Sequence, residues 1–346
     1  MKVLVTGHDG YIGAVLTPVF QAAGHEVVGL DSGLFGECAF GGGPDPIPSI
    51  ESDIRDVTSE QLVGYDAVVH LAALSNDPVG DLNPEATMEI NHRATVSLAR
   101  AAKDAGVERF LFSSSCSLYG AQGEDYIDES ASFNPLTPYG ESKILSERDL
   151  APLADDDFSP VFLRNATAYG VSPRLRGDVA VNNLTGFAFT TGKVFLKSDG
   201  SSWRPLVHVE DVARAFLAMV EARRDQVHGQ AFNIGATEEN YQIRDVAKLV
   251  SEVVPGSEVT MSDEAVNDPR SYRVTCAKFE EAFPDARPRW TVRKGIEELY
   301  EAFQRHGLKL EDLEGDRFMR IRHIKQLFAE GRLRDDLRWK AGGPGR

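Results

Sequence analysis

Short apolar runs alternate with amphipathic segments along the first half of the chain. The apolar runs contain many β-branched residues and end at small or polar ones, which predicts buried strands at residues 2–7, 26–31, 65–74, 107–115 and 159–170. The segments between them have helical spacing and predict helices at 8–25, 87–106 and 138–154. Because successive strand, helix and strand form a parallel pair with a right-handed crossover, the pattern predicts an α/β fold with an open, doubly wound, Rossmann-type parallel sheet.

The pattern loosens after residue 172. Further helices are predicted at 178–191, 209–222, 242–254 and 291–306, with short strands near 194–196, 231–234 and 258–261. We therefore expect three parts: a Rossmann domain at 1–172 to which segments near 205–235 return, a smaller interleaved C-terminal substrate-binding lobe at 173–310, and a basic helical tail at 311–346. The Gly- and Pro-rich segment 36–52 is predicted to be a surface loop.

The charge of the chain limits its partners. With 37 basic and 53 acidic residues the formal net charge is −16, which argues against a general nucleic-acid binder. The last thirty residues differ, since they hold nine Arg or Lys against three acids. Such a tail could pack as a basic amphipathic helix on an acidic face, its own or a partner subunit's, or it could stay solvated.

The cysteines and the apolar runs indicate where the protein works. Cys38, Cys116 and Cys276 lie far apart without a CxxC spacing, so we expect a reducing compartment and no metal site. The sequence has no signal-peptide pattern, and no apolar run is long enough to span a bilayer. These features predict a soluble, cytoplasmic protein with no membrane partner.

The first predicted turn carries a glycine-rich motif. Gly7, Gly10 and Gly13, with Tyr11 and Ile12 among them, fall between a strand and a helix at the start of a βαβ unit. Glycine lets the backbone turn tightly and approach a pyrophosphate, and the helix N-terminus directs free N–H groups at phosphates. This context predicts a dinucleotide site.

The acidic residue at the end of the second strand bears on the choice of dinucleotide. Asp31 can accept hydrogen bonds from ribose hydroxyls and would repel a 2′-phosphate, so NAD is favoured over NADP. The alternative is that Asp31 only caps a helix or a turn.

A tyrosine and a lysine lie four residues apart in the stretch PYGESK. On a helix Tyr139 and Lys143 share a face, and the ammonium group would lower the pKa of the phenol. Such a phenol can exchange a proton with a substrate alcohol. The alternative is a solvated helix face that carries one aromatic residue.

Taken in order, the motifs resemble those of a known family. They are TGHDGYIG (6–13), DIRD (53–56), HLAA (70–73), Asn91, SSSCSLYG (113–120), YGESK (139–143), LRNATAYG (163–170), NNL (182–184), RPLVHVEDVARA (204–215) and DPRSYRVTCAK (268–278). The chain is similar to the extended short-chain dehydrogenase/reductases that act on nucleotide sugars, the NAD-dependent epimerase/dehydratase type related to UDP-galactose 4-epimerase.

The resemblance implies roles for particular residues. Tyr139 would be the catalytic acid and base, Lys143 its partner, and Ser115 the hydrogen-bond donor to the reacting oxygen. NAD would be held by the glycine motif with Asp31, by Tyr139 and by Lys143, which would hold the nicotinamide ribose. The other residues of the NAD site would be Asp53, Ile54, Leu71, Ala72, Ala73, Asn91 and Ser113. A nucleotide-diphosphate sugar would be held by Ser115, Asn165, Asn183, Leu184, Arg204 and Arg270, although each arginine could instead form a surface salt bridge.

The resemblance also bears on the reaction. Dehydratases of the family carry an Asp/Glu pair, or at least a Glu, next to the serine, where this chain has Cys116 and Ser117. We therefore expect an epimerase acting at C4 of the sugar, with a ketoreductase of nucleotide-linked 4-keto-6-deoxy sugars as the alternative. A dehydratase, or a dinucleotide-binding protein without catalysis, is less favoured. The resemblance further implies a homodimer formed through the helix that carries the Tyr139/Lys143 pair.

Overall fold

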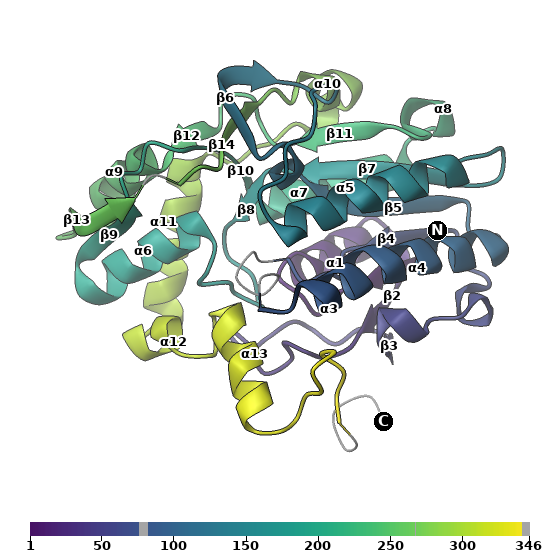
Figure 1. Cartoon of the computed structure of the whole chain (residues 1–346), viewed down its shortest axis with the longest axis horizontal. Coiled ribbons are helices and arrows are strands. Elements are labelled where there is room, and N and C mark those ends of the chain that lie inside the picture. The colour runs from purple at the N-terminus through teal and green to yellow at the C-terminus, as the bar shows by residue number, and fades with distance from the viewer. Residues whose placement is uncertain (76–81, 267, 341–346) are drawn as a thin grey trace.

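The computed structural model describes residues 1–75, 82–266 and 268–340, so the last six residues of the predicted tail lie outside it. Its centre is a seven-stranded sheet in the order β11-β7-β5-β4-β1-β2-β3, parallel throughout (Figure 1). The strands are β1 Lys2–Thr6, β2 Glu26–Asp31, β3 Ser49–Glu51, β4 Ala67–His70, β5 Arg109–Ser115, β7 Ser159–Asn165 and β11 Ala231–Ile234. The predicted doubly wound sheet is confirmed.

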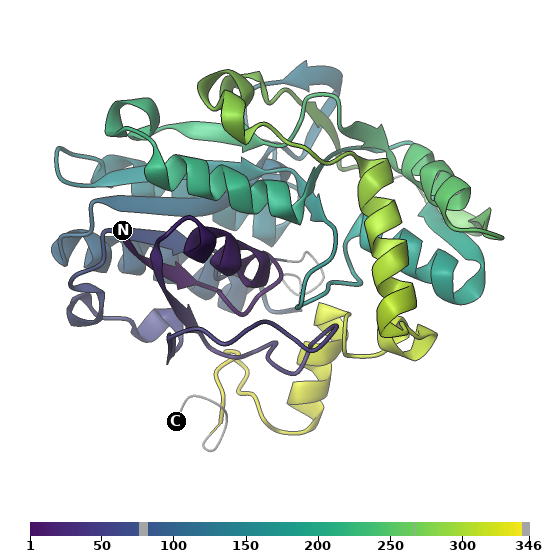
Figure 2. The ribbon, with the colours of Figure 1, turned by 180° about the vertical axis from the view of Figure 1, so that it is seen from behind.

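Helices cover both faces of this sheet. Helices α1 (Gly13–Ala22) and α7 (Val209–Glu221) pack on one face of the sheet, and this face points toward the viewer in Figure 2. Helices α4 (Ala94–Asp104) and α5 (Pro138–Leu150) pack on the other. The central strands are buried from both sides, which explains why they read as nearly continuous apolar runs.

A smaller lobe extends from one end of the sheet and has a core of its own. Its helices are α6 (Ala180–Thr191), α9 (Ile243–Val253), α11 (Val292–His306) and α12 (Leu310–Glu314). Three small sheets complete it, ordered β12-β10-β8, β13-β9 and β14-β6. Their strands are β6 Ala121–Ile127, β8 Thr167–Tyr169, β9 Lys193–Ser198, β10 Trp203–His208, β12 Asn240–Gln242, β13 Glu258–Val266 and β14 Ser271–Val274.

Several local expectations need correction. The predicted loop 36–52 contains β3, a short edge strand of the main sheet. The predicted helix 87–106 is not continuous, because α3 (Pro84–Met88) passes through a π-helical segment at Glu89–Arg93 before α4 begins. Strands β6, β10, β12 and β14 were not expected. Short helices α8 (Arg224–Val227) and α10 (Ala277–Ala282) lie near the β11 edge.

The C-terminal segment packs against its own chain. Helix α13 (Arg320–Ala329) is followed by a turn in which Leu333 and Trp339 form an antiparallel bridge. Apolar residues of this segment, among them Ile324 and Leu327, share a small core with Leu74 from the loop after β4. Of the two alternatives for the basic tail, packed or solvated, the packed one is therefore correct for the residues up to Lys340.

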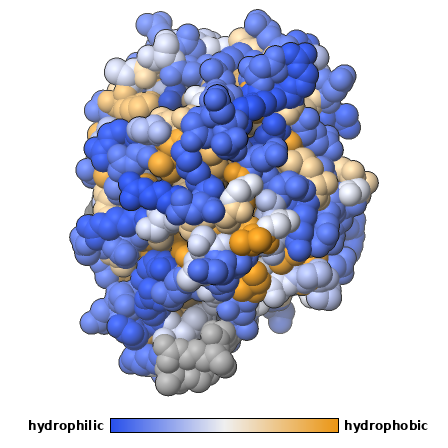
Figure 3. All heavy atoms as spheres, turned by 90° about the vertical axis from the view of Figure 1, so that its right-hand side faces the viewer, coloured by the Kyte–Doolittle hydropathy of each residue, from blue (hydrophilic) through white to orange (hydrophobic). Residues whose placement is uncertain are grey.

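Figure 3 shows that the side of the molecule at the right of Figure 1 is largely hydrophilic, with apolar side chains in small groups. No helix within the described ranges is both long and apolar enough to cross a bilayer.

Candidate active site

A cavity of about 730 Å³ opens at the carboxyl ends of the central strands, between the main sheet and the smaller lobe. In open α/β sheets ligands bind at this edge. Every site residue predicted from the sequence lines the cavity except Asn91. These are Gly7, Gly10, Tyr11, Ile12, Gly13, Asp31, Asp53, Ile54, Leu71, Ala72, Ala73, Ser113, Ser115, Tyr139, Lys143, Asn165, Asn183, Leu184, Arg204 and Arg270.

The glycine turn leaves no space for side chains. Gly7 has φ +74°, and a Cβ there would lie 2.7 Å from the Ala72 backbone nitrogen. A Cβ on Gly13 would lie only 2.2 Å from the Gly7 carbonyl oxygen. The first turn of α1 can therefore approach the end of β1 closely, and the residues from Gly10 to Gly13 line the cavity wall. This cradle suits the diphosphate of a dinucleotide.

Two aspartates line the cavity on the side of the glycine turn. The Asp31 carboxylate accepts hydrogen bonds from the backbone N–H groups of Gly33 at 2.9 Å and Asp9 at 3.2 Å, and burial raises its pKa. Asp31 thus shapes the turn after β2 and also lines the cavity. Asp53 is held by the Arg55 guanidinium; burial raises the Asp53 pKa, but the Arg55 contacts outweigh burial and leave it below its usual value.

The tyrosine and lysine share the cavity-facing side of α5. Thr137 caps this helix by accepting a hydrogen bond from the Gly140 N–H at 3.2 Å. The Lys143 ammonium lies 5.5 Å from the centre of the Tyr139 ring and donates to the Ser113 carbonyl at 2.7 Å. Burial lowers the pKa of Lys143 to about 7, and the Glu147 carboxylate opposes that effect only in part.

The end of β5 supplies the hydroxyl group beside this pair. Ser115 is the last residue of the strand, and its Oγ accepts a hydrogen bond from the Ser117 N–H at 3.1 Å. Its neighbour across the sheet is Asn165 on β7, whose amide donates to the Ser113 hydroxyl at 3.0 Å. A phenol, an ammonium and a hydroxyl group therefore line one wall of the cavity, a set suited to proton exchange with an alcohol.

Two arginines converge at the lobe end of the cavity. Arg204 donates to Asp268 at 2.7 Å, and Arg270 donates to the same carboxylate at 2.8 Å. Arg204 also donates to the Arg270 carbonyl oxygen. Asn183 and Leu184 lie nearby on α6, where the Asn183 amide donates to the Gly177 carbonyl at 2.6 Å. The paired guanidinium groups suit a diphosphate.

Asn91 has a different place from the one expected. It is 1% exposed within the π-helical segment, and its amide bonds to both the N–H and the carbonyl of Leu74. Asn91 therefore fixes the loop after β4, whose residues Ala72 and Ala73 form the cavity wall, and does not line the cavity itself.

Two potentially reactive residues outside the cavity, Cys116 and His208, make structural contacts. Cys116 is fully buried, burial raises its pKa, and its Sγ lies 3.1 Å from the Arg164 carbonyl oxygen. It begins a 3-10 turn, Cys116–Tyr119, directly after the end of β5. His208 caps α7 and stacks on Trp290 with ring centres 4.0 Å apart.

Further residues reach the cavity that sequence reasoning missed. Arg176 and Asp178 pair with each other at 2.8 Å on the wall between Tyr11 and the lobe. Their spacing in RLRGD is a common surface pattern, which gave no signal. Four residues of the C-terminal segment also line the cavity: Met319, Arg320, Ile321 and Leu337.

Comparison with known proteins identifies the class. The model of the NAD-dependent epimerase/dehydratase family matches residues 3–235, and the chain belongs to that family. It is an NAD-dependent enzyme of the extended short-chain dehydrogenase/reductase type. The glycine turn and Asp31 fit this cofactor, because the tight turn forms only without side chains at Gly7 and Gly13, and Asp31 lines the same cavity.

The relatives of this chain include sugar epimerases. A UDP-glucose 4-epimerase of Mycolicibacterium smegmatis is 32% identical over 251 residues, 68% of this chain and 77% of that protein. A UDP-glucose 4-epimerase of Bacillus subtilis is 27% identical over 86% of this chain and 94% of its own length. The solved structure of MoeE5 with UDP-glucuronic acid and NAD has a TM-score of 0.75 at 27% identity and covers 88% of this chain and 99% of its own.

Proposed function

We propose that this enzyme epimerises a UDP-linked hexose or hexuronic acid at C4 of the sugar. The observation that carries the proposal is the arrangement around Ser115: Tyr139 and Lys143 share its cavity wall, whereas the next two positions are Cys116 and Ser117. A dehydratase needs a group there that can act as an acid at neutral pH. Burial raises the pKa of Cys116, and its Sγ faces the Arg164 carbonyl oxygen.

The cavity residues divide the work. When bound, NAD supplies a nicotinamide ring that accepts a hydride from the sugar carbon and returns it. Tyr139, as phenolate, takes the proton of the C4 hydroxyl group and later gives it back. Ser115 donates a hydrogen bond to the same oxygen, and cationic Lys143 favours the phenolate. Arg204 and Arg270 hold the diphosphate, while Asn183 and Leu184 contact the nucleotide.

The names of the relatives support uridine as the base, since those compared above act on UDP-glucose or are bound to UDP-glucuronic acid. A second solved structure, a UDP-glucuronic acid 4-epimerase from Bacillus cereus, has a TM-score of 0.74 at 25% identity and covers 88% of this chain and 99% of its own. The sugar is therefore either a neutral hexose or a uronic acid, and the experiment must include both.

The test is chromatography of reactions with UDP-, dTDP-, GDP- and CDP-hexoses and UDP-glucuronic acid, without added cofactor. A new peak of unchanged mass is expected with a UDP-sugar. A product lighter by one water would identify a dehydratase and overturn the proposal. No conversion in this panel, followed by turnover of a 4-keto-6-deoxy sugar with added NADH or NADPH, would identify a ketoreductase instead.

We infer further that the enzyme is a homodimer formed through α4 and α5. The basis is the resemblance to nucleotide-sugar epimerases, together with the adjacent positions of these helices on one face of the sheet. Light scattering during size-exclusion chromatography should give twice the chain mass of 37.9 kDa.

A further inference from the structure

The C-terminal segment reaches back to the cavity at the end where the proposed NAD site begins. Met319, Arg320, Ile321 and Leu337 line the same cavity as Asp31, Ser32, Asp53 and Ile54. Residues almost 300 positions apart therefore form one wall. We propose that residues 317–340, here called the strap, close over the adenosine and diphosphate part of NAD and retain the cofactor. This inference rests on the proposed placement of NAD in the cavity.

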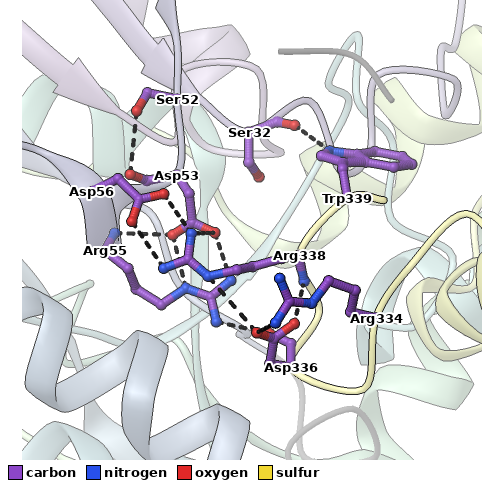
Figure 4. Close-up of polar contacts among 9 residues, drawn as sticks. All are labelled: Ser32, Ser52, Asp53, Arg55, Asp56, Arg334, Asp336, Arg338 and Trp339. Carbon is purple, nitrogen blue, oxygen red and sulfur yellow. Dashed lines mark hydrogen bonds and ion pairs between the residues drawn. The ribbon is translucent and has the colours of Figure 1, made fainter. Parts of the chain in front are cut away.

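The turn of the strap connects the two sides of the adenosine end. Trp339 donates from its indole N–H to the Ser32 carbonyl oxygen at 2.7 Å, in the loop after β2. Arg55, in the turn after β3, donates to the Asp336 carbonyl oxygen at 2.7 Å. Arg338 forms a two-pronged ion pair with Asp56 from that same turn. Figure 4 shows these side chains converging from the strap and from both walls.

Leu337 lies at the centre of this closure. Among the described residues it is the one non-glycine residue with positive φ, at +62°. Its side chain is 6% exposed and lines the cavity. A bulky residue keeps this sparsely populated conformation only where its surroundings hold it, and such residues cluster at ligand clamps. The contacts of Arg338 and Trp339 hold the backbone on its C-terminal side.

Arg320 gives the strap a charged group inside the cavity. Its side chain is buried and packs over the Phe35 ring at 4.0 Å, and one nitrogen donates to the Arg174 carbonyl at 3.3 Å. The other terminal nitrogen, Nη1, is buried and has no hydrogen-bond partner among the described residues. Arg320 lines the cavity, and a buried guanidinium that keeps an unused donor is suited to an anion. The diphosphate is the anionic part of NAD.

Helix α13 fixes the other end of the strap. His323 lies 3.0 Å from the Leu34 carbonyl oxygen through its Nε2, and Ile324 and Leu327 are fully buried. The Arg338 contacts are more exposed, since the Asp56 side chain is 56% exposed to solvent. The turn can therefore open while α13 remains packed. NAD would leave when the Leu337–Trp339 end lifts.

The test measures release of NAD from the full-length enzyme without any sugar. Protein loaded with isotopically labelled NAD is mixed with excess unlabelled NAD, and the label retained is followed by gel filtration. The Arg338→Ala variant should release NAD at least tenfold faster than wild type. Arg334→Ala is the matched control, because Arg334 lies in the same turn but pairs with Asp336 inside the strap; its release rate should stay within twofold.

Arg320→Met tests the charged contact and should also release NAD at least tenfold faster. If that buried substitution prevents folding, Arg338→Ala decides alone. Wild-type release rates in Arg338→Ala would overturn the strap, whatever the sugar panel shows. Fast release in the variant together with no turnover of any nucleotide sugar would support the strap and contradict the proposed function.

Amide hydrogen exchange gives a second readout that needs no variant. NAD should slow exchange at Arg334, Leu337 and Lys340, whose N–H groups bond within the turn. Unchanged exchange there on NAD binding would contradict closure of the strap over the cofactor.

Discussion

At the residue scale, the chemistry depends on a lysine that is buried next to a tyrosine. Lys143 lies 3% exposed between the Ser113 carbonyl and the Tyr139 and Phe112 rings. Its charge there is costly, which is why its pKa falls to about 7. Both charge states are populated near pH 7, and ionisation of the nearby phenol favours the cationic form that the proposed mechanism uses.

The first prediction concerns Tyr139 itself. Tyr139→Phe removes the hydroxyl group that exchanges the proton, so turnover of the epimerised sugar should fall about 10²–10⁴-fold, the usual contribution of general acid–base catalysis. The NAD content of the variant should not change. The measurement is steady-state turnover beside the quantity of NAD released on denaturation. Tyr126→Phe, at an exposed tyrosine of β6, is the control; full activity in Tyr139→Phe would exclude the assigned role.

The second prediction concerns the pH dependence of stability. The pKa of Lys143 is about 7 in the folded chain and ~10.4 in the unfolded chain, so between these values the unfolded state binds more protons. Stability therefore rises with pH in this window, by roughly 2 kcal/mol from pH 7 to pH 9. Lys143→Met should lack that gain. Urea unfolding of NAD-free protein at both pH values measures it.

The control for this experiment is Lys248→Met, at an exposed lysine of α9. Its unfolding free energy should follow the wild-type pH profile. A Lys143→Met profile that also runs parallel to wild type would show that Lys143 is not held at a lowered pKa.

The residues of the site differ in how far sequence alone could place them. Gly7, Asp31 and Ser115 lie at the carboxyl ends of parallel strands, so their convergence follows from topology. Asn91 shows the limit: its position in the motif order implied a cofactor contact, but the π-helical turn directs its amide to Leu74. Arg320 and Leu337 could not be predicted, because only tertiary packing brings them to the cavity.

At the scale of elements, α5 is fixed to the sheet by a buried ion pair. Glu147 accepts from Arg164 on β7 at 2.7 Å and from the Ser114 hydroxyl on β5 at 2.5 Å. Both charged side chains are less than 10% exposed. The helix that carries Tyr139 and Lys143 is thereby held in register with the strand ends that supply Ser115 and Asn165.

The third prediction follows from this pair. Glu147→Gln keeps the shape of the side chain but leaves the Arg164 charge buried without its partner, which should cost about 3 kcal/mol in the free energy of unfolding. Denaturant unfolding measures it. Glu141→Gln, at an exposed position of the same helix, should change stability by less than about 0.5 kcal/mol. Equal effects of the two substitutions would show that the pair does not anchor α5.

Strands that are buried on both faces could be predicted from the sequence. The central strands β1, β4 and β5 are apolar on both faces and stand out by composition alone. Strand β6, with the sequence AQGEDYI, is largely exposed and pairs with β14 about 150 residues later. Such a strand exists only because of its distant partner, so local pattern carries no signal for it.

At the scale of the whole molecule, the sign of charge divides the chain into an acidic body and a basic C-terminal segment. Of the net charge of −16, residues 317–346 contribute nine basic and three acidic side chains, which leaves the preceding residues strongly acidic. The sequence alone left open whether the tail packs, because opposite charge by itself does not show which surface the tail would contact. The structure places Arg332 on Glu37 and Arg338 on Asp56, both at the rim of the nucleotide-binding half.

The last prediction uses the exposure of these contacts. The Debye length falls from ~10 Å at 0.1 M salt to ~3 Å at 1 M, so the half-exposed Arg338–Asp56 pair weakens as NaCl is raised. Release of labelled NAD from the wild type should then accelerate several-fold across this range. Salt also screens the contacts between NAD and its own site. The Arg338→Ala variant lacks the ion pair, so its salt response reports those contacts alone. Its acceleration should be clearly smaller than that of the wild type. Arg334→Ala should respond as the wild type does. An identical salt response in wild type and Arg338→Ala would mean that the ion pair does not control how the strap opens.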